Sequence, residues 1–134
     1  AFITAAGGAI AGETARRFGA EGAAIACVDI AEENVKATAA DIEGAGGRAI
    51  ALVCDVSDEN AVKAAIASTV EAFGGLTTVF NAAAYSDPLM PLEELDVEVW
   101  RKTVDVGVTG MFIVAKYAIP HMRAAGGGSL SPAS

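Results

Sequence analysis

The segment Phe2-Ile3-Thr4-Ala5-Ala6-Gly7-Gly8-Ala9-Ile10-Ala11-Gly12 carries an apolar run directly into a turn made of small residues. Residues 2–6 read as a buried strand, and a helical pattern of apolar residues follows the turn as far as Phe18. A loop of small residues that opens a helix allows backbone N–H groups to approach a pyrophosphate closely. The alternative interpretation is a turn that is small only because it packs tightly.

The same alternation of apolar strand and amphipathic helix continues along the chain. Further strands are expected at residues 24–30, 49–54 and 77–83, and a fifth begins at Ser129. Ser57 is the expected N-cap of one intervening helix, and a long helix, possibly in two segments, is expected from about Asp96 towards His121. Apolar strands that alternate with helices are typical of a parallel sheet covered on both faces. We therefore predict a doubly wound, Rossmann-like α/β fold in one domain, residues 1–134.

Composition and charge narrow the class of protein. Apolar residues make up 53% of the chain, and nine Lys and Arg against seventeen Asp and Glu give a net charge of −8. This balance argues against a nucleic-acid-binding protein. No apolar run reaches the roughly 18 residues of a membrane span. No metal site is expected, since His121 has no second metal-ligating residue at a suitable spacing. Two cysteines do not form a disulfide framework, so we expect a cytoplasmic protein.

Asp29 strengthens the interpretation of the first turn as a nucleotide site. It ends the second predicted strand, about 20 residues after the loop, where dinucleotide folds place an acid on the adenosine ribose. A carboxylate there accepts the ribose hydroxyls and repels a 2′-phosphate. Because no Lys or Arg lies between Thr4 and Gly12, the pattern favours NAD over NADP. Asp29 could instead cap the helix that follows it.

Taken together, these segments resemble the classical short-chain dehydrogenases/reductases from residue 2 to about residue 129. The matching pieces are Thr4, Phe18, Glu21-Gly22-Ala23, Cys54-Asp55-Val56-Ser57, Phe73-Gly74-Gly75-Leu76, Asn81-Ala82-Ala83-Ala84, the helix from Trp100 to Met122, and Gly126-Gly127-Gly128-Ser129. In that family the Asp-Val segment lies against the adenine, and the piece at the place of Asn81-Ala82-Ala83-Ala84 reads Asn-Asn-Ala-Gly.

The resemblance implies an NAD(P)-dependent oxidoreductase that transfers hydride between a nicotinamide and an alcohol or carbonyl substrate. It also implies a strand order of 3-2-1-4-5 and a homo-oligomer that uses the long central helix. The residues expected to contact the cofactor are Gly7, Gly8, Ile10, Asp29, Ile30, Asp55, Val56, Asn81, Ala82 and Ala83.

The chain departs from the family at several functional positions. Ala5, Ala9 and Ala11 stand where the family has its three turn glycines. Each Cβ crowds the diphosphate or penalises a positive φ, at a cost of roughly 1 kcal/mol. We therefore expect weak binding of NAD. Gly107 stands where the family carries an Asn of its catalytic tetrad.

No catalytic residue is assigned. In the family, a Ser follows the fifth strand and a Tyr-x-x-x-Lys motif lies further along, whereas Ser134 falls just short of the Ser position. Tyr117 is followed four residues later by His121 instead of Lys. We therefore expect a chain truncated before its catalytic part and inactive on its own.

Other classes of protein remain open. A non-catalytic nucleotide-binding or interaction module is the main alternative to an enzyme. A methyltransferase that binds S-adenosylmethionine shares the glycine-rich turn and the acid, but it does not predict the Asp55-Val56 and Asn81 pieces. A response-regulator domain needs an acidic pair after the first strand, and residues 4–12 contain no acid.

Overall fold

Five short parallel strands form one sheet in the computed structural model, which describes residues 1–85 and 89–133. The strands are β1 (Phe2–Thr4), β2 (Ala24–Asp29), β3 (Arg48–Val53), β4 (Thr78–Asn81) and β5 (Ser129–Pro132). Their order across the sheet is β3-β2-β1-β4-β5, which confirms the predicted doubly wound arrangement with the first strand at the centre.

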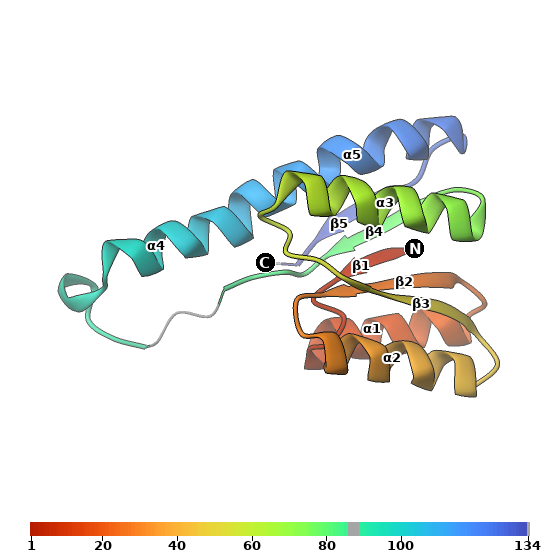
Figure 1. Ribbon diagram of the computed structural model, residues 1–134, viewed down its shortest axis with the longest axis horizontal. Helices are drawn as coiled ribbons and strands as arrows, with labels where there is room; N and C mark the ends of the chain where they lie inside the picture. Colours follow the sequence, from red (N-terminus) through yellow and green to blue (C-terminus); the bar gives the residue numbers. More distant parts are fainter. Residues whose placement is uncertain (86–88, 134) are drawn as a thin grey trace.

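Helices cover both faces of this sheet (Figure 1). One layer contains α1 (Ala9–Ala20) and α2 (Glu32–Gly44), and the other contains α3 (Glu59–Phe73) and α5 (Gly110–Ala124). Glycine marks a helix end here, since α3 ends at Gly74, whose φ of 78° favours glycine.

The sheet residues divide between two apolar cores, one on each face. Ile3 and Cys27 belong to the core that includes residues of α1 and α2, whereas Phe2 and Val28 belong to the core that includes residues of α3 and α5. All four side chains are fully buried. The central strands therefore read as continuous apolar runs, because neither face of the sheet meets solvent there.

The start of α3 corrects one expectation from the sequence. Asp58, not Ser57, is the N-cap, and its carboxylate accepts hydrogen bonds from the backbone N–H groups of Asn60 (2.9 Å) and Ala61 (3.1 Å). The Ser57 hydroxyl donates to Asp55 Oδ1 instead, at 2.6 Å. A carboxylate is the stronger acceptor for the unpaired N–H groups of a helix start, so Asp58 takes this position.

The long helix begins where the sequence predicts and has two segments. Asp96 is its N-cap and accepts a hydrogen bond from the backbone N–H of Glu98 at 2.8 Å. The first segment is α4 (Val97–Val104), and a π-helical turn at Asp105–Thr109 joins it to α5. Figure 1 shows α4 extending beyond the sheet while α5 lies over it.

By length and composition alone, the continuous stretch Val97–Ala124 is a candidate membrane span, contrary to the expectation from the sequence. It has 28 residues and a hydropathy of 1.2, and 22% of its most apolar window is buried. Core helices of soluble proteins satisfy the same criterion. Val114 and Ala118 on α5 are indeed fully buried. The exposed apolar residues of this stretch, here called the apolar stripe, are Val97, Trp100, Val108, Phe112 and Ile119.

Candidate nucleotide-binding site

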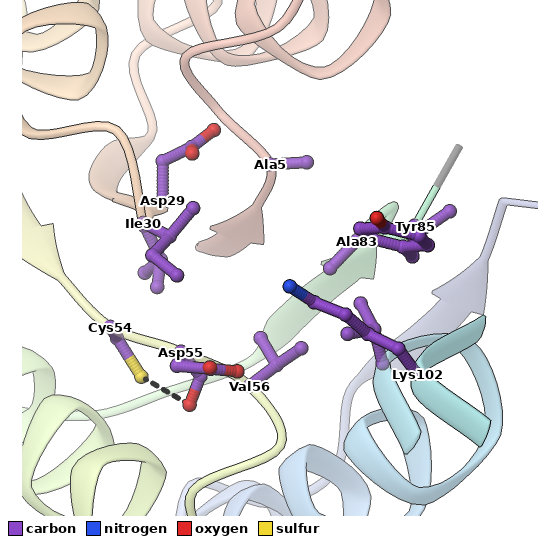
Figure 2. Close-up of a pocket in the computed structure, with 12 residues that line it drawn as sticks. Ala5, Asp29, Ile30, Cys54, Asp55, Val56, Ala83, Tyr85 and Lys102 are labelled. Carbon is purple, nitrogen blue, oxygen red and sulfur yellow. Dashed lines mark hydrogen bonds between the residues drawn. The ribbon is translucent and has the colours of Figure 1, made fainter. Parts of the chain in front are cut away.

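A pocket of about 220 Å³ opens at the carboxyl edge of the sheet, where β1 to β4 end (Figure 2). Doubly wound folds bind their ligands at this edge. The lining residues lie at or after the ends of these four strands or belong to the long helix: Ala5, Val28, Asp29, Ile30, Cys54, Asp55, Val56, Ala83, Ala84, Tyr85, Lys102 and Val106. Five of the ten residues predicted to contact a cofactor are among them: Asp29, Ile30, Asp55, Val56 and Ala83.

The turn after β1 adopts a backbone that favours glycine at one position. Ala5 has a φ of 56°, and it is the single non-glycine residue with positive φ in residues 1–85 and 89–133. Gly8 is the N-cap of α1, and because glycine has no side chain it makes no side-chain capping hydrogen bond. The N–H groups of the first helical turn are therefore available to an anion. The strain expected at Ala5 is thus present, and the helix start keeps its capacity to bind phosphate.

Asp29 connects this turn to the start of α2. Its Oδ2 accepts a hydrogen bond from the Gly7 backbone N–H, and its Oδ1 accepts one from the Ala31 N–H, both at 2.9 Å. A Cβ on Gly7 would lie 2.7 Å from the Asn34 Cβ, so the turn approaches α2 too closely for a side chain. Asp29 therefore holds the turn against the residue that precedes α2, but it does not cap α2, whose N-cap is Ala31 without a side-chain hydrogen bond. Each carboxylate oxygen accepts more than one hydrogen bond, so capacity for a ligand hydroxyl remains.

The opposite wall follows β3. Asp55 Oδ1 accepts hydrogen bonds from the backbone N–H (2.9 Å) and the hydroxyl (2.6 Å) of Ser57, and no hydrogen bond from the described residues reaches Oδ2. Val56 beside it is buried, whereas Ile30 across the pocket is 68% exposed. An exposed Ile facing a buried Val makes an apolar slot that suits a flat ring, with a carboxylate at its edge.

Cys54 contributes an inert thiol to the same wall. Burial raises the pKa of this thiol to about 11, and the negative charges of Asp55 and Asp58 act in the same direction. Its Sγ donates a hydrogen bond to the Asp55 carbonyl at 3.5 Å (Figure 2). Because the thiolate is the nucleophile, Cys54 is unsuited to covalent catalysis at neutral pH.

A buried polar network fastens β1 to β4 behind the pocket. The Thr4 hydroxyl donates to Asn81 Oδ1 at 2.7 Å and accepts from the backbone N–H groups of Ala82 (2.9 Å) and Ala83 (3.0 Å). Asn81 is only 3% exposed, and its Nδ2 has no partner among the described residues. Asn81 and Ala82 therefore shape the pocket from behind and do not line it.

The remaining predicted positions lie around the pocket. Gly7, Gly8 and Ile10 belong to the turn and the first turn of α1, and Ile10 is exposed to solvent. Gly107 lies in the π-helical turn, a feature often found at functional sites, with open space where a Cβ would stand. Ser134 lies outside the described residues. Within residues 1–85 and 89–133, no cluster of three His, Cys, Asp or Glu could hold a metal.

Seven lining residues were not among the predicted contacts, namely Ala5, Val28, Cys54, Ala84, Tyr85, Lys102 and Val106. The Lys102 Nζ lies 4.8 Å from the centroid of the Tyr85 ring. Val106 directly precedes Gly107, and Lys102 stands four residues before Val106 on the long helix. Because they are four residues apart, helical periodicity would have placed Lys102 on the same face as Val106, the neighbour of Gly107.

Comparison with known proteins gives the site a context. The sequence model of a family described as "Enoyl-(Acyl carrier protein) reductase" matches residues 5–132. The 2,5-dichloro-2,5-cyclohexadiene-1,4-diol dehydrogenase LinX of Sphingobium indicum is 41% identical over 130 residues, which are 97% of this chain and 52% of that protein. The D-threitol dehydrogenase of Mycolicibacterium smegmatis is 32% identical, over 97% of this chain and 50% of that protein. The chain thus spans about half the length of these relatives.

Solved structures agree with the sequence relatives. NAD⁺-bound xylitol dehydrogenase superposes with a TM-score of 0.94 at 32% identity, over 98% of this chain and 50% of the other. A 7α-hydroxysteroid dehydrogenase complexed with NADH and 7-oxo glycochenodeoxycholic acid gives 0.93 at 26% identity, over 99% and 51%. The family model matches nearly the whole chain, and the five-stranded fold with its pocket at the strand ends agrees with that match. The chain belongs to the short-chain dehydrogenase/reductase family of oxidoreductases.

Proposed function

We propose that this chain is the cofactor-binding half of an NAD-dependent oxidoreductase that moves hydride between a nicotinamide and an alcohol or carbonyl substrate. The observation that carries the proposal is Asp29. Its carboxylate lies in the pocket, is held by the Gly7 and Ala31 N–H groups, and has acceptor capacity left. A carboxylate fixed in this way suits the two hydroxyls of an adenosine ribose and repels a 2′-phosphate.

The residues present fit such a dinucleotide. Ile30 and Val56 would hold the adenine between them, and the free Oδ2 of Asp55 would accept from its amino group. The first-turn N–H groups of α1 would bind the diphosphate, with the Cβ of Ala9 crowding it. When bound, the nicotinamide accepts or donates the hydride. The relatives named for a cyclohexadiene diol, D-threitol and xylitol support an alcohol as the reduced substrate.

The chain by itself is expected to show no turnover. Reduction of a carbonyl needs a proton donor for the developing alkoxide, and the sequence contains no Tyr-x-x-x-Lys motif. Gly107 also lacks the amide of the family's Asn. Gly107 is the observation that favours the alternative function, a nucleotide-binding module without catalysis. An assay of NAD reduction over a panel of secondary alcohols distinguishes the two, because turnover by this chain contradicts both inactivity and the non-catalytic alternative.

Cofactor choice is tested by calorimetric titration with NAD, NADP and S-adenosylmethionine. We expect weak binding of NAD, weaker binding of NADP and none of S-adenosylmethionine. Asp29→Asn should lower the ratio of NAD affinity to NADP affinity. Partial loss of folding would weaken both affinities alike and leave this ratio unchanged. Asp41→Asn is the matched control, since Asp41 pairs with Arg16 on the surface between α1 and α2. A preference for NADP in the unmodified chain contradicts the assignment.

We also propose that the protein is a cytoplasmic homo-oligomer. The apolar stripe supports assembly, since Phe112 is 63% and Val108 64% exposed on one continuous helical stretch. Contiguous exposed apolar surface of this kind is typical of interfaces. Cys27 and Cys54, both free and buried, suit a reducing compartment. Light scattering on the purified chain tests assembly, and a monodisperse monomer at high concentration contradicts it.

A further inference from the structure

Lys102 places an ammonium group inside the pocket. It projects from α4 towards the middle of the space enclosed by Asp29, Val56 and Ala83 (Figure 2). Its Nζ lies 4.8 Å from the centroid of the Tyr85 ring, which orients the side chain by a cation–π contact. Of the twelve residues found to line the pocket, Lys102 is the single Lys or Arg.

No carboxylate of the described residues pairs with this ammonium. Across residues 1–85 and 89–133, Lys102 forms no ion pair, whereas Lys36 and Lys116 pair with Glu32 and Glu59. Among the described residues, neither pocket carboxylate forms an ion pair with Lys102, although both keep acceptor capacity for a ligand. Asp29 accepts from two backbone N–H groups, and Asp55 accepts from Ser57. Lys102 is therefore a cation that faces a ligand space and has no carboxylate partner in the described part of the chain.

A nucleotide entering this pocket needs such a cation. The chain has a net charge of −8, and Asp29 and Asp55 add two carboxylates to the pocket itself. A dinucleotide brings two negative phosphates, which these charges repel. The turn at residues 4–12 contains no Lys or Arg, so only neutral N–H groups face the phosphates there. An ammonium in the same pocket offsets that repulsion and donates charge-assisted hydrogen bonds.

We propose that Lys102 is a cofactor-binding residue that recognises the phosphate groups of the bound nucleotide, with Tyr85 as its positioning residue. This rests on the proposed function, because it assigns one more contact to the same dinucleotide. Asp29 selects the ribose, and Lys102 supplies the attraction for phosphate that the turn lacks. The long helix, which carries no phosphate-binding residue predicted from the sequence, thus takes part in binding.

The test compares probes that differ only in phosphate. Binding of adenosine, ADP and ADP-ribose to the unmodified chain and to Lys102→Met is measured by calorimetry at low and high salt. Lys102→Met should weaken ADP and ADP-ribose about five- to tenfold, the range of a partly exposed charge-assisted hydrogen bond, and adenosine less than twofold. The salt dependence of ADP binding should fall, and Lys102→Arg should retain most of the affinity. Lys63→Met is the matched control, because Lys63 is an exposed lysine of α3 that does not line the pocket.

Four results overturn the inference. Equal weakening of adenosine and ADP would assign Lys102 to the adenine ring, and equal weakening by Lys63→Met would leave only an effect of net charge. Unchanged ADP binding in Lys102→Met removes the proposed contact while the proposed function stands. If the unmodified chain binds neither adenosine nor ADP, the proposed function fails and this inference fails with it.

Discussion

Replacing Ala5 by Gly should stabilise the fold, although glycine usually destabilises. Ala5 has a φ of 56°, and a left-handed conformation costs a residue with a Cβ roughly 1–2 kcal/mol. Glycine removes that cost but gains freedom in the unfolded chain, which offsets about 0.4–1 kcal/mol. The net expectation is a gain of about 0.5–1 kcal/mol in the free energy of unfolding.

Ala9→Gly is the matched control. Ala9 begins α1 with right-handed backbone, so the same substitution there removes no strain and should cost up to about 0.5–1 kcal/mol. Urea denaturation followed by circular dichroism measures both variants. At a slope of about 2 kcal/mol per molar urea, Ala5→Gly should raise the midpoint by roughly 0.4 M, and Ala9→Gly should lower it. Equal destabilisation by both variants would refute the argument from strain at Ala5.

Three further predictions follow from the same structure. Restoring all three turn glycines, at Ala5, Ala9 and Ala11, should tighten NAD binding measured by calorimetry; unchanged affinity means that these Cβ atoms do not crowd the diphosphate. Phe112→Glu should shift light scattering towards the monomer, whereas Ile10→Glu, at an exposed residue outside the apolar stripe, should not; equal effects contradict the interface. Because burial raises the pKa of Cys54 to about 11, iodoacetamide should alkylate the folded chain slowly at pH 8. The protonated thiol of Cys54 favours the folded state. Its contribution to the free energy of unfolding is therefore complete below the ordinary thiol pKa of 9.0 and is lost as the pH rises through about 11. Rapid alkylation at pH 8 contradicts the buried thiol.

The sheet order was within reach of sequence reasoning because burial of both faces leaves a plain signal. Residues such as Phe2, Ile3 and Val28 lie in strands without polar alternation, and glycines mark the helix ends. The N-cap of α3 could not be predicted from the sequence, because Ser57 and Asp58 are both good N-cap residues. Only the hydrogen bond from Ser57 to Asp55 decides between them.

The site was predicted best where residues directly follow a strand. Asp29 and Asp55 line the pocket because strand ends meet at one edge of a parallel sheet. Tyr85 was missed because its proximity to Lys102 depends on how α4 crosses the pocket, which no local pattern encodes. The hydrogen bond by which Asp29 holds the Gly7 N–H became visible only with the approach of the turn to α2.

The central claim is that this chain binds NAD at the carboxyl ends of β1 to β3. The most direct measurement is a titration of the isotopically labelled chain with NAD, followed by the backbone amide signals in nuclear magnetic resonance, which also detects weak binding. The account predicts saturable shifts concentrated at Gly7, Ile30 and Val56. Absence of shifts, or shifts concentrated at the opposite end of the sheet around Phe18 and Thr78, would contradict it.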